Sequence, residues 1–198
     1  MRVISGIRKG HNLKSPKGKN IRPTEDKIKE SLFNIISPII DDAIVLDLFS
    51  GTGQIGIEFL SRGANKAFFV DKSNISISII KENLLHTKLL DKSIIHNKDA
   101  RVALKLFTEE NLEFDYIYID PPYKEYELVT QTLEIIVCNN LLKSTGLIII
   151  EHDNDLILDD RIKTLIKIDI RKYKSKSLTF YRIGDKIWML YTQEVLTL

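Results

Sequence analysis

Residues 43–56 read Ala43-Ile44-Val45-Leu46-Asp47-Leu48-Phe49-Ser50-Gly51-Thr52-Gly53-Gln54-Ile55-Gly56, an apolar run that leads directly into a glycine-rich turn. A short apolar run bounded by turn residues is typical of a buried strand, and glycines permit a tight turn into a following helix. Open α/β sheets bind ligands at the carboxyl ends of their strands, which is where this turn falls. We therefore predict a strand at 43–49, a turn and helix at 50–61, and a ligand site between them.

Apolar runs and helical patterns alternate along the rest of the chain, which favours an α/β fold with a mostly parallel seven-stranded sheet and helices on both faces. A first helix is expected from Thr24, as its N-cap, until Pro38 stops it. Further strands are expected at 66–71, 93–97, 114–120 and 147–151, and further helices at 73–87, 100–108 and 126–139. Beyond residue 160 the period changes to two, which predicts an antiparallel C-terminal edge. Its strands are expected at 165–171, 178–183 and 186–191, the last two joined by a hairpin through Gly184-Asp185.

The composition suits one globular domain without a membrane span. The chain has 198 residues, of which 43% are hydrophobic and 28% charged. No apolar run approaches the roughly 20 residues that a membrane span needs, and the N-terminus lacks the apolar stretch of a signal peptide. We therefore expect a cytoplasmic protein. The single cysteine, Cys138, follows apolar residues, so we expect it in the core, with no internal disulfide and no Cys/His metal site.

The net charge of +2 conceals an uneven distribution of basic residues. The first 24 residues contain seven lysines and arginines and no acid, with glycines and a proline marking turns among them. Such an arm fits phosphate contacts better than an ordinary surface does, so we predict a nucleic-acid-binding arm at 1–23 ahead of a catalytic domain at 24–198. The residues expected to bind RNA are Arg2, Arg8, Lys9, Lys14 and Arg22. A second basic stretch at 161–176 could be solvated surface or a further phosphate contact.

The glycine turn has two interpretations. Its pattern Gly51-x-Gly53-x-x-Gly56, with Asp71 about 20 residues later, also occurs in dinucleotide-binding enzymes, so a nicotinamide-dependent oxidoreductase is one hypothesis. Asp47 argues against it, because a carboxylate beside the turn would repel an anionic pyrophosphate. S-adenosylmethionine has no phosphate there and offers an ammonium and a sulfonium, which Asp47 would attract.

Acids after the next two predicted strands complete a possible S-adenosylmethionine site. Asp71 can accept hydrogen bonds from both ribose hydroxyls, and Asp99 with Ala100 can bind the adenine edge. Each acid alone could be an exposed strand end or a helix cap. Three acids at successive strand ends favour the cofactor site.

The motif Asp120-Pro121-Pro122-Tyr123 ends the predicted strand at 114–120. Asp-Pro-Pro could simply terminate a strand. A base amine, however, is a poor nucleophile because its lone pair is delocalised into the ring. If the Asp120 carboxylate and the Pro121 carbonyl both accept hydrogen bonds from the amine, they favour a pyramidal nitrogen aimed at the sulfonium methyl. The prolines fix the backbone, and Tyr123 can stack on a flipped base, so we assign these four residues to catalysis.

These motifs resemble those of the class I Rossmann-like methyltransferases with a D/N-P-P-Y/F motif. The chain is more similar still to the bacterial family that methylates guanine N2 in small-subunit (16S) ribosomal RNA. That similarity extends to about residue 182 and includes three further features: Arg22-Pro23-Thr24, the segment 26–34 and Leu60-Ser61-Arg62-Gly63-Ala64. The chain departs from the family at Lys174, where relatives tend to carry a glycine after the tyrosine matching Tyr173.

The resemblance implies a small N-terminal β-hairpin that contacts RNA, with Arg22 and Thr24 near the cofactor pocket. It also implies ribosomal RNA, or an assembling small ribosomal subunit, as the partner, and no metal. The expected cofactor-binding residues are Asp47, Phe49, Gly51, Gly53, Gly56, Asp71, Asp99, Ala100 and Thr24.

The sequence leaves three alternatives to guanine-N2 methylation open. A DNA or RNA adenine-N6 methyltransferase would carry the same four-residue motif. The short arm and C-terminal edge argue against a DNA enzyme, which usually needs a recognition domain. An oxidoreductase would bind NADH and give Asp120 no role, and a non-catalytic RNA-binding module would transfer no methyl group.

Overall fold

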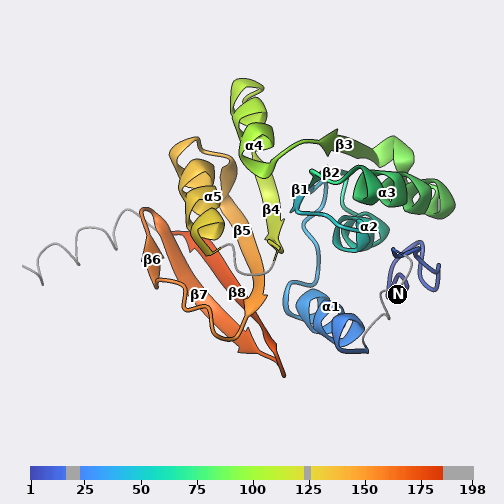
Figure 1. Ribbon diagram of the computed structural model, residues 1–198, viewed down its shortest axis with the longest axis horizontal. Helices are drawn as coiled ribbons and strands as arrows, with labels where there is room; N and C mark the ends of the chain where they lie inside the picture. Colours follow the sequence, from blue (N-terminus) through green and yellow to red (C-terminus); the bar gives the residue numbers. More distant parts are fainter. Residues whose placement is uncertain (17–22, 123–125, 185–198) are drawn as a thin grey trace, which may run out of the picture.

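The computed structural model describes residues 1–16, 23–122 and 126–184, which form an α/β sandwich around one mixed sheet (Figure 1). In this part of the chain the sheet has eight strands in the order β3-β2-β1-β4-β5-β8-β7-β6. The five strands from β3 to β5 pair in parallel, and the pairings from β5 through β8 and β7 to β6 are antiparallel. The strands are β1 (Ile44–Leu48), β2 (Lys66–Asp71), β3 (Ser93–Asn97), β4 (Phe114–Ile119), β5 (Leu142–Asp153), β6 (Arg161–Ile162), β7 (Leu165–Lys172) and β8 (Lys176–Ile183).

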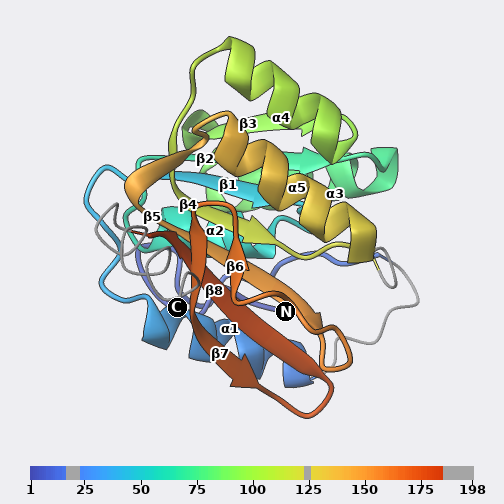
Figure 2. The same ribbon diagram turned by 90° about the vertical axis from the view of Figure 1, so that its left-hand side faces the viewer.

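Helices cover both faces of the sheet (Figures 1 and 2). The helices are α1 (Pro23–Ile35), α2 (Gln54–Ser61), α3 (Asn74–Thr87), α4 (Ala100–Glu109) and α5 (Tyr126–Cys138), with a short 3-10 helix at Leu90–Lys92. Apolar residues of α1, α2 and α3 pack with Val45 and Tyr116 on one face. Those of α4 and α5 pack with Leu46 and Ile117 on the other. Successive strand residues point to opposite faces, so each parallel strand contributes to both cores.

The predicted α/β architecture and its antiparallel C-terminal edge are confirmed, but the described residues form eight strands instead of the predicted seven. Strand β5 is longer than the expected 147–151, and the two-residue β6 was not expected. The hairpin at this edge joins β7 to β8 through residues 173–175. The strand expected at 186–191, and Asp185 in its hairpin, lie outside the described residues. None of the described helices has the length and apolar character needed to cross a membrane.

Two local predictions are wrong. Helix α1 begins at Pro23, so Thr24 lies within its first turn rather than at the N-cap; proline suits a first helical position because its fixed φ already matches the helix. Cys138 is exposed instead of buried. It is the last residue of α5, two positions beyond the buried Ile136, and a rotation of about 200° carries it to the opposite side of the helix.

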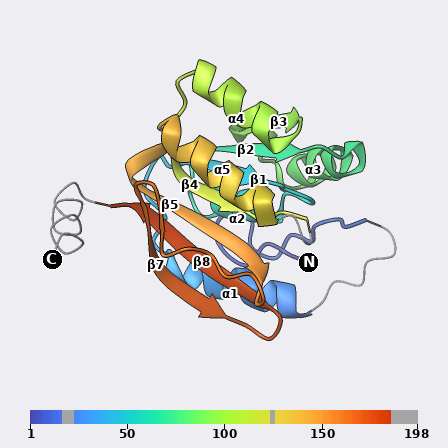
Figure 3. The same cartoon turned by 60° about the vertical axis from the view of Figure 1, so that its left-hand side comes forward.

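The residue that replaces the expected glycine after Tyr173 does not disturb the β7–β8 turn. The Tyr173 amide donates to the Lys176 carbonyl at 2.7 Å, which closes a four-residue turn. Lys174 is not among the residues with positive φ, so its position does not require glycine. The hydroxyls of Tyr173 and Ser31 are hydrogen-bonded, which places the turn beside α1, as Figure 3 also shows.

Candidate active site

Four acidic residues lie at the carboxyl ends of four adjacent strands. Asp47 is near the end of β1, Asp71 ends β2, Asp120 follows β4, and Glu151 is near the end of β5. The registers Leu48↔Val70, Leu48↔Ile119 and Ile119↔Ile150 align these ends. Each acid is two residues beyond one that packs on the α1–α3 face, so strand alternation directs all four toward that face.

The glycine turn between β1 and α2 has the backbone conformation that its sequence predicts. Gly51 has φ 56° and Gly53 has φ 76°, a region that glycine occupies without steric cost. Phe49 also has a positive φ, 67°, although it has a side chain. Gly56 is required for a different reason: a Cβ there would lie 2.4 Å from the Phe69 ring. The first turn of α2 therefore packs directly against β2.

Asp47 is buried beneath this turn, with 1% of its surface exposed. Its Oδ2 accepts a hydrogen bond from the Gly56 amide at 2.9 Å. Burial raises the pKa of Asp47 to about 7, an effect that the Gly56 hydrogen bond reduces and the Asp71 charge reinforces. The carboxylate thus anchors the first turn of α2, and a positive charge close to it would stabilise its ionised form.

Asp71 braces the other side of the turn. Its two oxygens accept hydrogen bonds from the amides of Gly51, at 2.9 Å, and Ser73, at 2.8 Å. The Asn97 side chain, at the end of β3, donates to the Asp71 carbonyl at 3.2 Å. Asp71 is only partly buried, so its carboxylate has room for the further hydrogen bonds that a ribose would offer.

Asp99 and Ala100 begin α4, after β3. Asp99 is the N-cap, and its carboxylate accepts hydrogen bonds from the backbone and side chain of Arg101. These hydrogen bonds hold the pKa of Asp99 below its usual value. Ala100 is buried at the start of the helix. Asp99 therefore caps helix α4, which is one of the two roles that the sequence left open for this acid. The cap does not exclude a contact with a ligand.

The Asp120 segment follows β4, the strand beside β1. Asp120 and Pro121 are partly buried and Pro122 is exposed, whereas Tyr123 lies outside the described residues. Two residues earlier, the buried Tyr118 donates its hydroxyl hydrogen to Glu151 Oε2 at 2.6 Å. Burial, together with the charges of Glu151, Asp120 and Asp47, raises the pKa of Tyr118 well above its ordinary value. The Tyr118 hydroxyl therefore stays protonated and donates a hydrogen bond to a neighbouring carboxylate.

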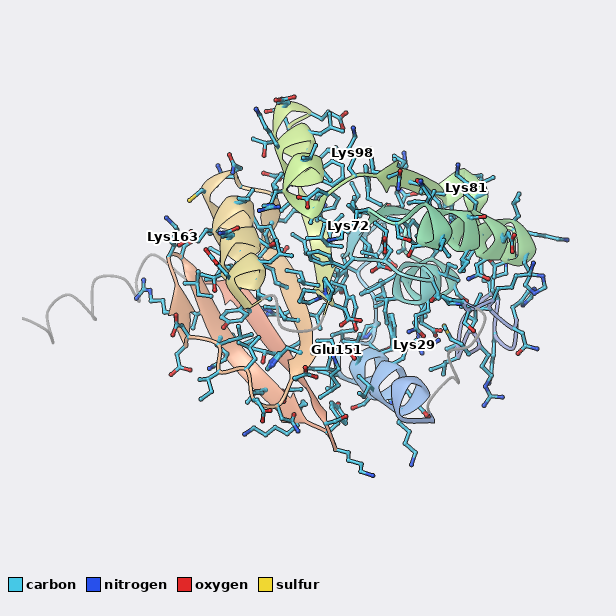
Figure 4. All side chains as sticks on the ribbon, in the orientation of Figure 1. Lys29, Lys72, Lys81, Lys98, Glu151 and Lys163 are labelled. Atoms are coloured by element: carbon cyan, nitrogen blue, oxygen red, sulfur yellow. The ribbon has the colours of Figure 1, made fainter. Side chains whose placement is uncertain are left out.

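Glu151 and Tyr118 were not singled out from the sequence, although signals for both were present. Alternation along β4 puts Tyr118 on the same face as Asp120, and Glu151 ends the strand expected at 147–151. Figure 4 shows Glu151 near the end of β5, on the side of α1.

The N-terminal arm is fastened to α2 and α3 as well as being basic. Arg2 and Asn12 form a single antiparallel bridge, so the arm folds back on itself as the expected hairpin does, but without regular strands. Glu58 of α2, which is fully buried, accepts hydrogen bonds from the amides of Ile4 and Ser5 at 2.8 and 2.9 Å. It also accepts one from Arg62 at 2.8 Å and pairs with the buried Lys29 at 3.8 Å. This buried carboxylate fixes the arm against α2, the helix that follows the glycine turn.

The basic side chains of the arm differ in their surroundings. Arg2 and Lys9 are exposed. Lys14 forms an ion pair with Glu82 at 2.7 Å, and Arg8 donates to the Lys88 carbonyl at 3.3 Å. Arg22 lies outside the described residues, and although the backbone of Thr24 is helical, its side chain is not described. Within the described parts of the chain, no group of three or more His, Cys, Asp or Glu residues could hold a metal ion.

Known proteins are similar to this chain in both sequence and fold. A family described as "Conserved hypothetical protein 95" matches residues 1–182. YlbH of Bacillus subtilis, whose name gives it provisionally as an rRNA methyltransferase, is 38% identical over 182 residues, covering 92% of this chain and 98% of that protein. Ribosomal RNA small subunit methyltransferase D of Haemophilus influenzae is 33% identical over 156 residues, 78% of this chain and 80% of that one.

A solved structure from Escherichia coli has the same fold. That protein is described provisionally as the methyltransferase yhhF. It is 26% identical to this chain and superposes with a TM-score of 0.80, covering 93% of this chain and 98% of its own. The fold similarity therefore extends over nearly the full length of both proteins.

Proposed function

The chain belongs to the family described as conserved hypothetical protein 95, and on that premise we propose that it methylates the N2 amine of a guanine in small-subunit ribosomal RNA. The methyl donor is S-adenosylmethionine. The names of the relatives, rRNA methyltransferase and ribosomal RNA small subunit methyltransferase D, support an rRNA substrate. A ribosomal substrate would support a cytoplasmic location for the reaction. Both naked RNA and the assembling subunit are candidate partners.

One observation is the main support for the proposed reaction. The glycine turn and the Asp120 segment follow neighbouring parallel strands, with Leu48 in register with Ile119. Adjacent strands are about 4.8 Å apart, so a donor bound at the turn lies within reach of an amine bound at Asp120. Catalysis of such a transfer depends mainly on holding the two reacting groups in line.

In the proposed donor site, the sulfonium and ammonium of the cofactor lie near Asp47, the ribose hydroxyls bond Asp71, and the adenine lies near Asp99 and Ala100. Gly51 and Gly53, which have no side chains, allow the cofactor to approach the backbone closely. Asp47 favours a cation over the pyrophosphate of a dinucleotide, because its ionised form would repel phosphate. The oxidoreductase hypothesis therefore has less support.

In the proposed acceptor site, the Asp120 carboxylate and the Pro121 carbonyl accept hydrogen bonds from the two amine hydrogens. They would direct the nitrogen lone pair at the sulfonium methyl that S-adenosylmethionine supplies. The N–C bond would form as the C–S bond breaks, and the bonding electron pair would stay with the sulfur of the neutral thioether. The amine, now positively charged, loses a proton, which Asp120 can accept.

An adenine-N6 methyltransferase is the nearest competing function, since its target is also an exocyclic amine. The proposal is tested by incubating the purified protein with isotopically labelled S-adenosylmethionine and either unmethylated 16S RNA or small ribosomal subunits. Digestion and mass spectrometry then identify the methylated nucleoside. N2-methylguanosine is the expected product. Label in N6-methyladenosine, or label in neither substrate, would contradict the proposal.

A further inference from the structure

Glu151 lies next to Asp120 at the carboxyl edge of the sheet. The parallel register of β4 and β5 pairs Tyr118 with Ile149 and Ile119 with Ile150, so Asp120 comes next to Glu151. Both side chains belong to the face that packs against α1 and α2, because Tyr118 and Ile149 do. The Glu151 carboxylate, a hydrogen-bond acceptor, therefore lies one strand away from Asp120, whose carboxylate is proposed to bind the target amine.

A hydrogen bond from a buried residue holds the Glu151 carboxylate in position. Tyr118 is buried, and its hydroxyl bonds Glu151 Oε2 at 2.6 Å. A carboxylate has about four acceptor positions, so the Tyr118 bond occupies one of them and is compatible with a further bond from a substrate. A side chain fixed by a buried donor is suited to reading a base, because little conformational freedom remains to be lost on binding.

Guanine and adenine differ at the ring nitrogen next to the exocyclic amine. In guanine the N1–H is a donor beside the N2 amine, whereas in adenine N1 is an acceptor beside the N6 amine. We propose that Glu151 accepts the N1–H of the target guanine while Asp120 accepts from its N2 amine, which makes Glu151 a specificity-determining residue. This inference rests on the proposed guanine-N2 activity. An adenine in the same position would set an acceptor against the carboxylate.

The size of the effect follows from the loss of a donor. Sites built to hydrogen-bond a particular substrate group reject analogues that lack the group far more strongly than apolar pockets reject a change in size. We expect at least about 30-fold discrimination, well below the roughly 10⁴-fold that such sites can reach.

The test compares two RNA fragments that contain the methylated site, one with guanine and one with 2-aminopurine at the target position. Both bases carry the N2 amine, but only guanine has the N1–H. The wild-type protein should favour guanine by at least about 30-fold in kcat/KM, and Glu151→Gln should reduce this ratio to about threefold or less. Cofactor affinity should not change.

Two further variants separate recognition from a structural role. Tyr118→Phe removes the hydroxyl but keeps the Glu151 carboxylate, so it should reduce the ratio only partly. Asp153→Asn changes another acid of β5, one that pairs with Lys176 at 3.4 Å, and should keep the wild-type ratio. If Glu151 merely supported Tyr118, the Glu151 and Tyr118 variants would lose activity equally on both bases and the ratio would stay at its wild-type value.

If Glu151→Gln kept the wild-type ratio of kcat/KM between the two RNAs, the inference would be overturned and the proposed function would stand. A wild-type ratio near one would have the same meaning. Failure of the wild-type protein to methylate either RNA would instead reject the proposed function, and with it the role of Glu151.

Discussion

The carboxylate of Asp47 accepts a hydrogen bond from the Gly56 amide at 2.9 Å, which joins the end of β1 to the first turn of α2. The bond lies in a buried environment, where an ionised carboxylate is unfavourable unless a positive charge or further donors compensate it. The free protein therefore holds a carboxyl group that a cationic ligand would stabilise in its charged form.

Cofactor affinity should consequently depend on pH. Because the pKa of Asp47 is raised to about 7, this group is mostly protonated below that value, and a sulfonium bound near it favours the ionised form. Binding below pH 7 then releases a proton, so affinity should rise by up to about tenfold per pH unit between pH 5.5 and 7 and level off above. Calorimetry in buffers of different ionisation enthalpy measures both quantities.

The matched variant for this prediction is Asp47→Asn, which keeps an acceptor for the Gly56 amide but cannot ionise. Its affinity should be lower at pH 7.5 and nearly independent of pH. A wild-type profile as flat as that of the variant would mean that the cation of the ligand does not approach Asp47.

Gly56→Ala should destabilise the fold by about 1–3 kcal/mol, because the new methyl group would overlap the Phe69 ring, whose Cε1 lies 2.4 Å from the added Cβ. Gly51→Ala is the control, since a Cβ there meets no atom within 4 Å and only the positive φ opposes it. Urea unfolding of both variants, alone and with Phe69→Leu, gives the measurement. Phe69→Leu should reduce the loss of stability caused by Gly56→Ala but not that caused by Gly51→Ala. If it changed the stability of both variants equally, overlap with Phe69 would not explain the Gly56 effect.

The elements that follow from local patterns were predictable, but side-chain roles set by tertiary contacts were not. The strand at 43–49 and the turn after it have a period and glycines that the sequence displays directly. Glu58 gave no such signal, because an acid in a helix is usually solvated, and only packing of the arm against α2 makes it a buried acceptor for Ile4 and Ser5. Cys138 was misplaced for a related reason: its apolar neighbours did not reveal where α5 ends.

Within the site, strand order determined what could be foreseen. The acids Asp47, Asp71 and Asp120 lie at or just after the carboxyl ends of their strands, so their common location could be predicted from the rule for parallel sheets. The bond between Tyr118 and Glu151 could not, because it depends on β4 and β5 being adjacent and on their register. No local pattern encodes that pairing.

Asp120→Ala should abolish methyl transfer and leave cofactor affinity within about threefold of wild type. The reason is that Asp120 is proposed to bind the target amine rather than the donor, and removal of an interaction used in the transition state lowers kcat. Single-turnover kinetics with labelled S-adenosylmethionine and calorimetric affinity measure the two effects. A variant that turns over normally would exclude Asp120 from the mechanism.

Asp71→Ala should give the opposite pattern, because its main effect should be a lower affinity for S-adenosylmethionine. The substitution removes the proposed ribose contacts and also the bonds to the amides of Gly51 and Ser73. Loss of a charged acceptor that bonds a ligand typically costs about 1.5–3 kcal/mol, so Kd should rise by roughly 10- to 100-fold. An unchanged Kd by calorimetry would refute the ribose assignment.

Replacement of Arg8, Lys9 and Lys14 together by Ala should weaken RNA binding and reduce its dependence on salt. Each lost phosphate contact lowers the slope of log affinity against log salt by about 0.7–0.9. Because Lys14 already pairs with Glu82 and Arg8 with the Lys88 carbonyl, the exposed Lys9 should account for most of the change. Lys105→Ala is the control for Lys9→Ala, since it removes the same charge from an exposed position on α4, which covers the face of the sheet opposite the arm. Fluorescence anisotropy with labelled RNA over a salt series distinguishes the variants; equal slopes for both single substitutions would show that the arm attracts RNA no more than any other basic surface.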